Sequence, residues 1–195
     1  MLFHKFVVLI VTLSGAAHAG ENLLSDGNFA SAPVPSWTPV PLTLSYSVIA
    51  NDGQPAPPSA EMTTSGSGSS GQGLYQCVPT TAGMVYRLSA YIKSTSASAT
   101  TVSAVGLAAV FYTGTTCKSG GFPLGLGNAT VGPNTLTANV WTAVNSGPVT
   151  APAGTQSALV GLGANGANTA VYTFRADTAF FGLNDVLFFD GFENY

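Results

Sequence analysis

Residues 73–94, GLYQCVPTTAGMVYRLSAYIKS, contain the pattern that decides the fold class. Apolar and polar side chains alternate over residues 86–93, with Tyr86, Leu88, Ala90 and Ile92 in phase. A period of two puts one set of side chains on a core and the other set on an open face of a β-strand. Residues 74–78 form a second expected strand, and residues 79–83 supply the turn residues between the two.

The same alternation recurs along the chain, so we predict an all-β protein. It is clear in residues 42–49 and again in residues 102–112, while residues 60–63 are expected to form a short strand. Only 7% of the residues are charged, so the polar surface must consist largely of Ser, Thr, Asn and Gly, which suit strands and turns better than exposed helices. Residues 64–73 are expected to form a loop within one domain, and residues 113–139 a long irregular segment.

The first 19 residues have the layout of a secretory signal peptide. Lys5 precedes an apolar run, and Ala17-His18-Ala19 offers a small-x-small cleavage site. The run is too short to span a bilayer stably, although a retained N-terminal anchor is the alternative. We therefore expect a secreted or periplasmic bacterial protein without membrane insertion, in which residues 20–195 form a single domain that requires no cofactor to fold.

Composition excludes several classes of function. Both histidines, His4 and His18, lie in the predicted signal peptide, which argues against Ser-His-Asp or Cys-His catalysis and against His-ligated zinc. The basic residues that follow it are few and scattered, so no nucleic acid or anionic lipid is expected as a partner. They are Arg87, Lys93, Lys118 and Arg175.

The two cysteines, Cys77 and Cys117, predict a disulfide, because an exported chain folds in an oxidising compartment. A disulfide that closes a loop of this length should stabilise the folded chain by about 4 kcal/mol. A catalytic thiol is the alternative, but it would have no histidine partner.

Several short motifs together resemble the carbohydrate-binding modules of the family 4/9 type. They are Asn-Leu-Leu at residues 22–24 followed by Phe29 and Trp37, Tyr-x-Leu-Ser-x-Tyr at residues 86–91, the strand around Trp141, Ala-Pro-Ala-Gly at residues 151–154, and Asn-Asp-Val at residues 184–186. The resemblance covers most of the chain after residue 19, in the right order. It implies a jelly-roll β-sandwich of two antiparallel sheets, with Trp37 and Trp141 in the core, that binds glycan or polysaccharide without catalysis.

Four residues form the predicted carbohydrate site. Arg87 and Tyr91 lie on the open side of the central strand, and Tyr75 and Tyr112 are expected to join them on a shallow sheet face. The small Gly106 and Ala108, on the same side as Tyr112, would leave room for a ligand. The alternative is that these tyrosines pack against loops with their hydroxyl groups in water.

The resemblance also implies a structural calcium ion between the first and last strands. Asp185 and Asp26 are the predicted ligands, and Glu21 could contribute. Ala30 and Asn184 stand where the family usually carries acids, so two of the expected carboxylates are missing.

Two other classes of function stay open. A structural or adhesive envelope protein that associates with itself would also suit low charge and exposed sheet edges. The carboxylates leave a paired-acid glycosidase as a further alternative, and four of them lie in the last 19 residues, at Asp177, Asp185, Asp190 and Glu193. We expect a binding protein rather than an enzyme, and assign no role to the terminal Phe-Phe-Asp-Gly-Phe-Glu sequence.

Overall fold

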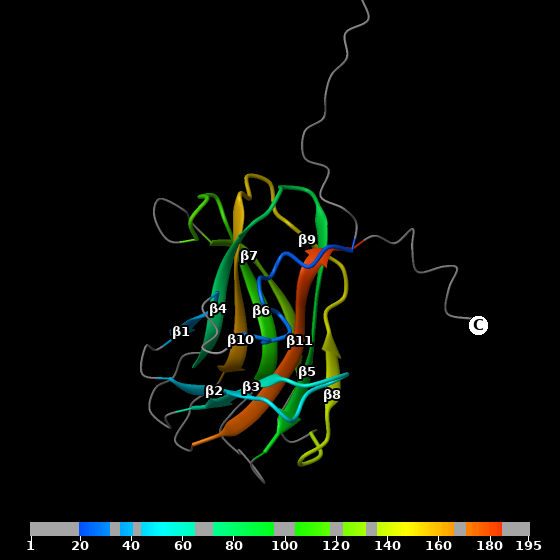
Figure 1. Cartoon of the computed structure of the whole chain (residues 1–195). Coiled ribbons are helices and arrows are strands. Elements are labelled where there is room, and N and C mark those ends of the chain that lie inside the picture. The colour runs from blue at the N-terminus through cyan, green and yellow to red at the C-terminus, as the bar shows by residue number, and fades with distance from the viewer. Residues whose placement is uncertain are drawn as a thin grey trace, which may run out of the picture.

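The computed structural model describes residues 20–31, 36–40, 44–64, 72–95, 104–117, 123–131, 136–165 and 171–184 (Figure 1). These ranges contain strands, turns and no helix, and accordingly no helix among them could cross a membrane. The predicted signal peptide at residues 1–19 lies outside them, as does Asp185.

The strands are divided between two layers, and the chain passes from one layer to the other several times. They are β1 (Thr38–Val40), β2 (Ser45–Ile49), β3 (Ser59–Thr63), β4 (Gln72–Pro79), β5 (Val85–Ser94), β6 (Ala104–Tyr112), β7 (Pro123–Val131), β8 (Thr142–Asn145), β9 (Val149–Thr150), β10 (Ser157–Asn165) and β11 (Thr173–Leu183). One sheet has five strands in the order β1-β4-β10-β6-β7, and the other has six, β2-β3-β11-β5-β8 with β9 paired to β5. All pairings are antiparallel, which confirms the predicted sandwich.

The two predicted strands of residues 73–94 are present but belong to different sheets. β4 pairs with β10, whereas β5 pairs with β11. Residues 80–84 carry the chain from one layer to the other, with Gly83 at φ +76° and its N–H donating to the carbonyl of Ala151 at 2.9 Å. Alternation along a strand shows which side is buried, but not which sheet the strand joins.

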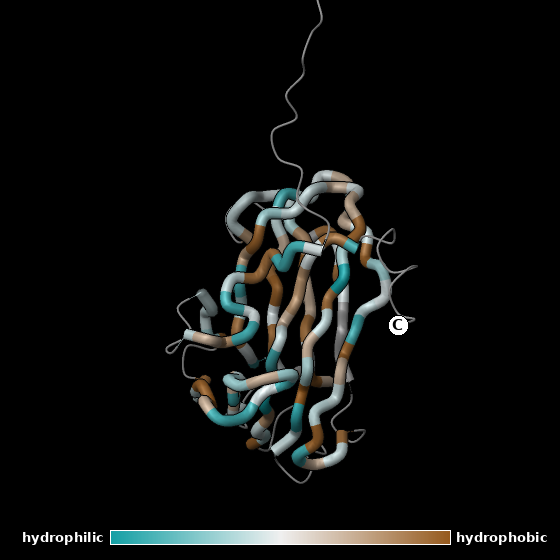
Figure 2. The backbone as a smooth tube through the Cα atoms, turned by 45° about the vertical axis from the view of Figure 1, so that its right-hand side comes forward, coloured by the Kyte–Doolittle hydropathy of each residue, from teal (hydrophilic) through white to brown (hydrophobic). Residues whose placement is uncertain are grey.

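Inward-facing side chains of both sheets form the core. In β5 these are the predicted Tyr86, Leu88, Ala90 and Ile92, each at most 3% exposed. The ring of Tyr86 stacks on Phe181 of β11, with centroids 5.0 Å apart. Hydrophilic and hydrophobic residues accordingly alternate along the strands in Figure 2.

The expectation of an irregular segment over residues 113–139 is wrong, because β7 lies within it. The reason is that in β7 the small residues face the core and the apolar residues face outward. An added Cβ on Gly127 would lie 2.8 Å from Val149 Cγ1, so this glycine faces the other layer. Leu126 is instead 59% exposed. Leucines outside and glycines inside do not give the apolar alternation by which a strand is recognised.

The two tryptophans differ in their surroundings. Trp37 is buried against Phe29, as predicted, with ring centroids 5.7 Å apart. Trp141 is only half-buried, and its indole N–H donates to Asp52 Oδ1 at 3.3 Å. Its predicted place in the core is therefore wrong, because a polar partner holds it at the surface of the six-stranded sheet.

Candidate functional site

The four predicted carbohydrate-binding residues lie on opposite sides of the sandwich. Tyr75 of β4 and Tyr112 of β6 point outward from the five-stranded sheet, since Leu74, Phe111 and their in-phase neighbours are buried. Arg87 and Tyr91 of β5 point outward from the six-stranded sheet. The structure thus brings the residues together in two pairs and not as one site.

A groove of about 490 Å³ lies on the outer face of the five-stranded sheet. Its volume is within the range of about 300–1,000 Å³ that is usual for small-molecule sites. Tyr75, Cys77 and Leu159 contribute from β4 and β10. The remaining lining residues are Thr38, Val40, Thr116 and Cys117.

Glycines lie beside Tyr75 on the five-stranded sheet. Gly73, Gly163 and Gly106 are register partners across β4, β10 and β6, so they form one row across the sheet. An added Cβ on Gly161 would lie 2.4 Å from Tyr75 Cε1, so the tyrosine ring extends over this glycine. The result is an aromatic ring that lies flat over the sheet beside a row of glycines.

The register places Tyr75 and Tyr112 in different parts of this face. Tyr75 is aligned with Gly161, whereas Tyr112 is aligned with Ser157. That offset of four residues and two strands separates their Cα atoms by roughly 17 Å. Tyr75 lines the groove and Tyr112 does not, and partial burial raises the pKa of the Tyr75 phenol. Tyr75 is therefore the tyrosine that belongs to the groove.

A short segment after β6 borders the groove. Residues 113–117, which we call the strap, run from Tyr112 to the predicted disulfide, confirmed between Cys77 and Cys117. Ser157 of β10 is completely buried although it follows the outward phase, and its hydroxyl donates to the carbonyl of Gly114 at 2.5 Å. The strap therefore crosses β10 on the outer side of the sheet.

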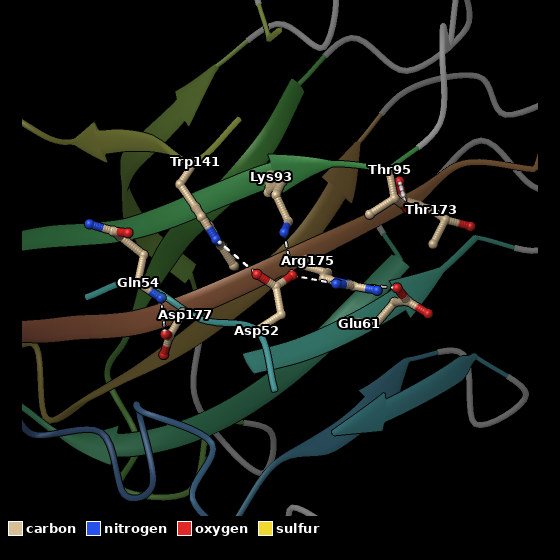
Figure 3. A network of polar contacts seen from close by, with 9 residues as sticks. All are labelled: Asp52, Gln54, Glu61, Lys93, Thr95, Trp141, Thr173, Arg175 and Asp177. Carbon is tan, nitrogen blue, oxygen red and sulfur yellow. Dashed lines mark hydrogen bonds and ion pairs between the residues drawn. The ribbon is translucent and has the colours of Figure 1, made fainter. Parts of the chain in front are cut away.

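The outer face of the six-stranded sheet is polar by contrast. Asp52 accepts hydrogen bonds from Lys93 and Arg175, and Arg175 Nε donates to Glu61 Oε2 at 2.8 Å (Figure 3). The Lys93 ammonium also lies 4.9 Å from the centre of the Trp141 ring. We call Asp52, Glu61, Lys93, Trp141 and Arg175 the polar cluster.

Residues 50–58, between β2 and β3, are fastened to this face at two points. Asp52 reaches from the loop to the cations of the sheet, and Asp177 of β11 accepts a hydrogen bond from the backbone N–H of Gln54 at 2.6 Å. Asp177 is 1% exposed, and burial raises its pKa despite the opposing hydrogen bonds from the N–H groups of Gln54 and Thr178. Both carboxylates are occupied in holding the loop, so the arrangement favours a structural role over acid–base chemistry.

Charge is divided unequally between the two outer faces. Of the charged side chains that the structure describes, Glu21 and Asp26 belong to the N-terminal segment. The other six lie on the six-stranded side of the sandwich, and they are Asp52, Glu61, Arg87, Lys93, Arg175 and Asp177. Within the described residues the groove is therefore lined without a formal charge.

Asp52→Asn is expected to lower the free energy of unfolding at pH 7 by about 1–3 kcal/mol, because it leaves buried Lys93 without its counter-charge. Burial acts to raise the pKa of Asp52, but the hydrogen bonds from Lys93 and Arg175 outweigh it and hold the pKa below its ordinary value. This stabilisation is present above the unfolded-state pKa and is lost as the pH falls through the folded-state pKa. Urea unfolding from pH 7 to pH 2 should show the variant and wild type converging in acid, and a constant difference would contradict the assignment.

The predicted calcium ligands are tested only in part. Asp26 Oδ1 accepts the N–H of Ala30 at 2.8 Å, while Oδ2 is buried and has no hydrogen-bond partner among the described residues. Asp185 lies outside those residues, and within them no three metal-ligating side chains come together. One free carboxylate oxygen is compatible with a cation, but it is far fewer than the six to eight oxygens that calcium takes.

Sequence reasoning missed most of the groove. Thr38, Val40, Leu159 and Thr116 carry no pattern that marks a ligand site. One signal was available, because Gly161 and Gly163 occupy alternate positions of β10 just as Gly106 and Ala108 do in β6. Small residues at every second position on two neighbouring strands indicate a sheet face on which a neighbouring side chain can lie flat, as Tyr75 does over Gly161.

No family model and no curated protein matches the sequence, so membership of family 4/9 stays a prediction. Solved structures are nevertheless similar in fold. The CBM22-1 xylan-binding domain of Paenibacillus barcinonensis Xyn10C matches with a TM-score of 0.61 at 20% identity, over 86% of this chain and 97% of that domain.

Two larger structures match over a domain-sized part. The CBM22-1-GH10 modules of Clostridium thermocellum xylanase 10B, complexed with xylohexaose, have a TM-score of 0.55 at 14% identity over 77% of this chain. Arabinose-bound MgGH51 α-L-arabinofuranosidase has a TM-score of 0.58 at 19% identity over 87% of this chain. The chain spans only 26% and 27% of these structures. What it shares with all three is the architecture, a β-sandwich of the kind found in carbohydrate-binding modules.

Proposed function

We propose that the protein binds neutral glycans without catalysis, through the groove on the outer face of the five-stranded sheet. The observation that carries the proposal is the ring of Tyr75 extending over Gly161 in a groove lined without charge. Tyr112 lies on the same face but outside the groove, at the level of Ser157.

The chemistry of the groove suits a sugar. A pyranose ring offers apolar C–H patches rimmed by hydroxyl groups, so it is recognised by an aromatic surface with polar groups at the edge. Tyr75 and Leu159 supply the apolar surface, and the threonines at positions 38 and 116 border it. The absence of charge among these lining residues favours neutral over acidic polysaccharides.

The comparisons support this proposal through the fold. Two of the similar structures are named for xylan binding or contain xylohexaose, and the sequence motifs resemble the family 4/9 modules. The Cys77–Cys117 disulfide fits the exported, extracytoplasmic protein that the N-terminal sequence predicts. Arg87 and Tyr91, on the other face, become the competing site.

Titration with a panel of soluble polysaccharides tests the function. We expect binding to a neutral β-linked glycan such as xylan, with a dissociation constant that changes less than about twofold between low and high salt, because no ion pair forms. Isothermal titration calorimetry at both salt concentrations provides the measurement. Binding restricted to acidic glycans and abolished by salt would move the site to the face of Arg87 and Tyr91.

A structural or adhesive role is the second candidate, and β7 is the observation that favours it. This strand forms one edge of the five-stranded sheet and exposes Leu124 and Leu126. Unprotected edges with apolar side chains promote association between chains. This role would be favoured if no glycan of the panel binds and the protein associates with itself at micromolar concentration in sedimentation velocity experiments.

We keep a structural calcium ion at Asp26 and Asp185 as a proposal. Its support is the buried, unpartnered Asp26 Oδ2 described above. Calcium added to chelator-treated protein should raise the melting temperature, because a ligand that binds only the folded state stabilises it. Asp26→Asn should abolish this rise, and an unchanged melting temperature in wild type would remove the ion from the proposal.

A further inference from the structure

We propose that the strap, residues 113–117, is a wall of the groove that admits unbranched glycan chains and rejects chains with substituents at the sugar on Tyr75. This inference rests on the proposed function. It concerns a segment that none of the sequence motifs singled out, and it assigns a role to the disulfide beyond stability.

The position of the strap is fixed by three neighbouring strands. The chain leaves β6 at Tyr112, passes over Ser157 of β10, and is bonded to β4 through Cys77. Ser157 is completely buried beneath it, and its hydroxyl donates to the carbonyl of Gly114. The strap therefore stands above the sheet surface at this end of the groove, where Thr116 and Cys117 line it.

A second wall is provided by β1. Thr38 is the register partner of Tyr75, and Val40 is the partner of Gly73. Both side chains line the groove, and Val40 is 40% exposed. A sugar lying on Tyr75 is thus bordered by β1 on one side and by the strap at the end near Cys77. A substituent directed toward either one would meet protein rather than solvent.

The two walls differ in how they are held. β1 is hydrogen-bonded into the sheet as an edge strand, whereas the strap belongs to no strand. Its attachment to β4 is the covalent link at Cys77. The hydrogen bond from Ser157 to the Gly114 carbonyl still joins the first part of the strap to β10 when the disulfide is absent. Removal of the disulfide should therefore free the end of this wall at Thr116 and Cys117 and leave the sheet, the core and Tyr75 in place.

The double variant Cys77→Ala/Cys117→Ala tests the proposal. The probes are xylohexaose and a xylohexaose backbone carrying single arabinose substituents, titrated by calorimetry. We expect wild type to prefer the unsubstituted chain by at least about tenfold. In the double variant, affinity for the unsubstituted chain should fall by about threefold to tenfold, and the preference should shrink to within about threefold.

Met62→Ala is the matched control for lost stability. Met62 is fully buried in β3 of the other sheet, so the substitution weakens the fold without touching the groove. It should leave both affinities as in wild type at a temperature where all variants are folded by circular dichroism. A similar loss of preference in Met62→Ala would show that global destabilisation, and not the strap, is responsible.

Thr116→Trp gives a second test that keeps the disulfide. A larger side chain at the exposed position 116 should narrow the groove and weaken binding of the substituted chain further, by at least about threefold relative to the unsubstituted chain. This variant decides the question if the cysteine variant fails to fold. Unchanged affinities and preference in a folded strap variant would overturn the inference.

The outcomes separate the two levels of proposal. If wild type binds the unsubstituted chain and Tyr75→Ala does not, the proposed function holds whatever the strap variants do. If wild type binds neither probe nor any other glycan of the panel, the proposed function fails and the inference fails with it.

Discussion

Tyr75→Ala should weaken binding of a neutral glycan by roughly tenfold to a hundredfold, the loss typical of truncating an aromatic anchor in a binding site. The ring borders the groove and covers Gly161, so its removal takes away the largest apolar surface available to a sugar. Tyr75→Phe should retain most of the affinity, because the phenyl ring keeps the same surface. Calorimetric titration with the best ligand of the glycan panel provides the measurement.

The sandwich supplies a matched control for this experiment. Tyr91 is also a half-buried, outward-facing tyrosine in the middle of a long strand, but it belongs to the other sheet. Tyr91→Ala should therefore bind like wild type. If Tyr91→Ala or Arg87→Ala loses affinity while Tyr75→Ala keeps it, the glycan binds to the six-stranded face and the groove is not the site.

Phe181→Ala should lower the free energy of unfolding by about 3–5 kcal/mol, the usual cost of removing a buried aromatic ring. Phe181 is fully buried, and its ring stacks on Tyr86 with an interplanar angle of 12° and lies 6.4 Å from Phe111 of the opposite sheet. It therefore joins the two layers at the centre of the core. Urea denaturation followed by circular dichroism measures the change.

Phe180→Ala is the control at the neighbouring position. Phe180 is half-buried, faces outward, and has the Arg87 guanidinium 6.0 Å from its ring centre. Its loss should cost at most about 1 kcal/mol, as for an exposed cation–π contact. Equal losses for the two variants would contradict the described phase of β11 and the place of Phe181 in the core.

The sequence allowed the buried side of most strands to be predicted, because alternation reports directly on it. Tyr86, Leu88, Ala90 and Ile92 face the core as expected. Strand partners could not be predicted in the same way, since pairing depends on contacts between distant residues. As a result Tyr75 and Arg87, only twelve positions apart, were assigned to one face although the intervening residues 80–84 change sheets.

The errors at β7 and Trp141 have different physical causes. In β7 the inward positions are glycines that fit close to Val149 and Pro152, so a packing requirement replaced the apolar pattern. Trp141 was expected in the core because large aromatic residues usually bury their surface. Here the Lys93 ammonium lies against the indole ring, and Asp52 accepts a hydrogen bond from the indole N–H. These two charged partners hold the tryptophan at the surface.

The order of the strands has a consequence for how the chain reaches this fold. β10 lies in the middle of the five-stranded sheet and β11 in the middle of the six-stranded sheet, although both come from the last quarter of the chain. The central partners of β4 and β5 therefore lie about 80 to 95 positions further along the chain. This separation gives a high contact order, which places folding in the slow range of milliseconds to seconds. A nascent chain that ends before Ser157 would present both half-built layers without their central strands.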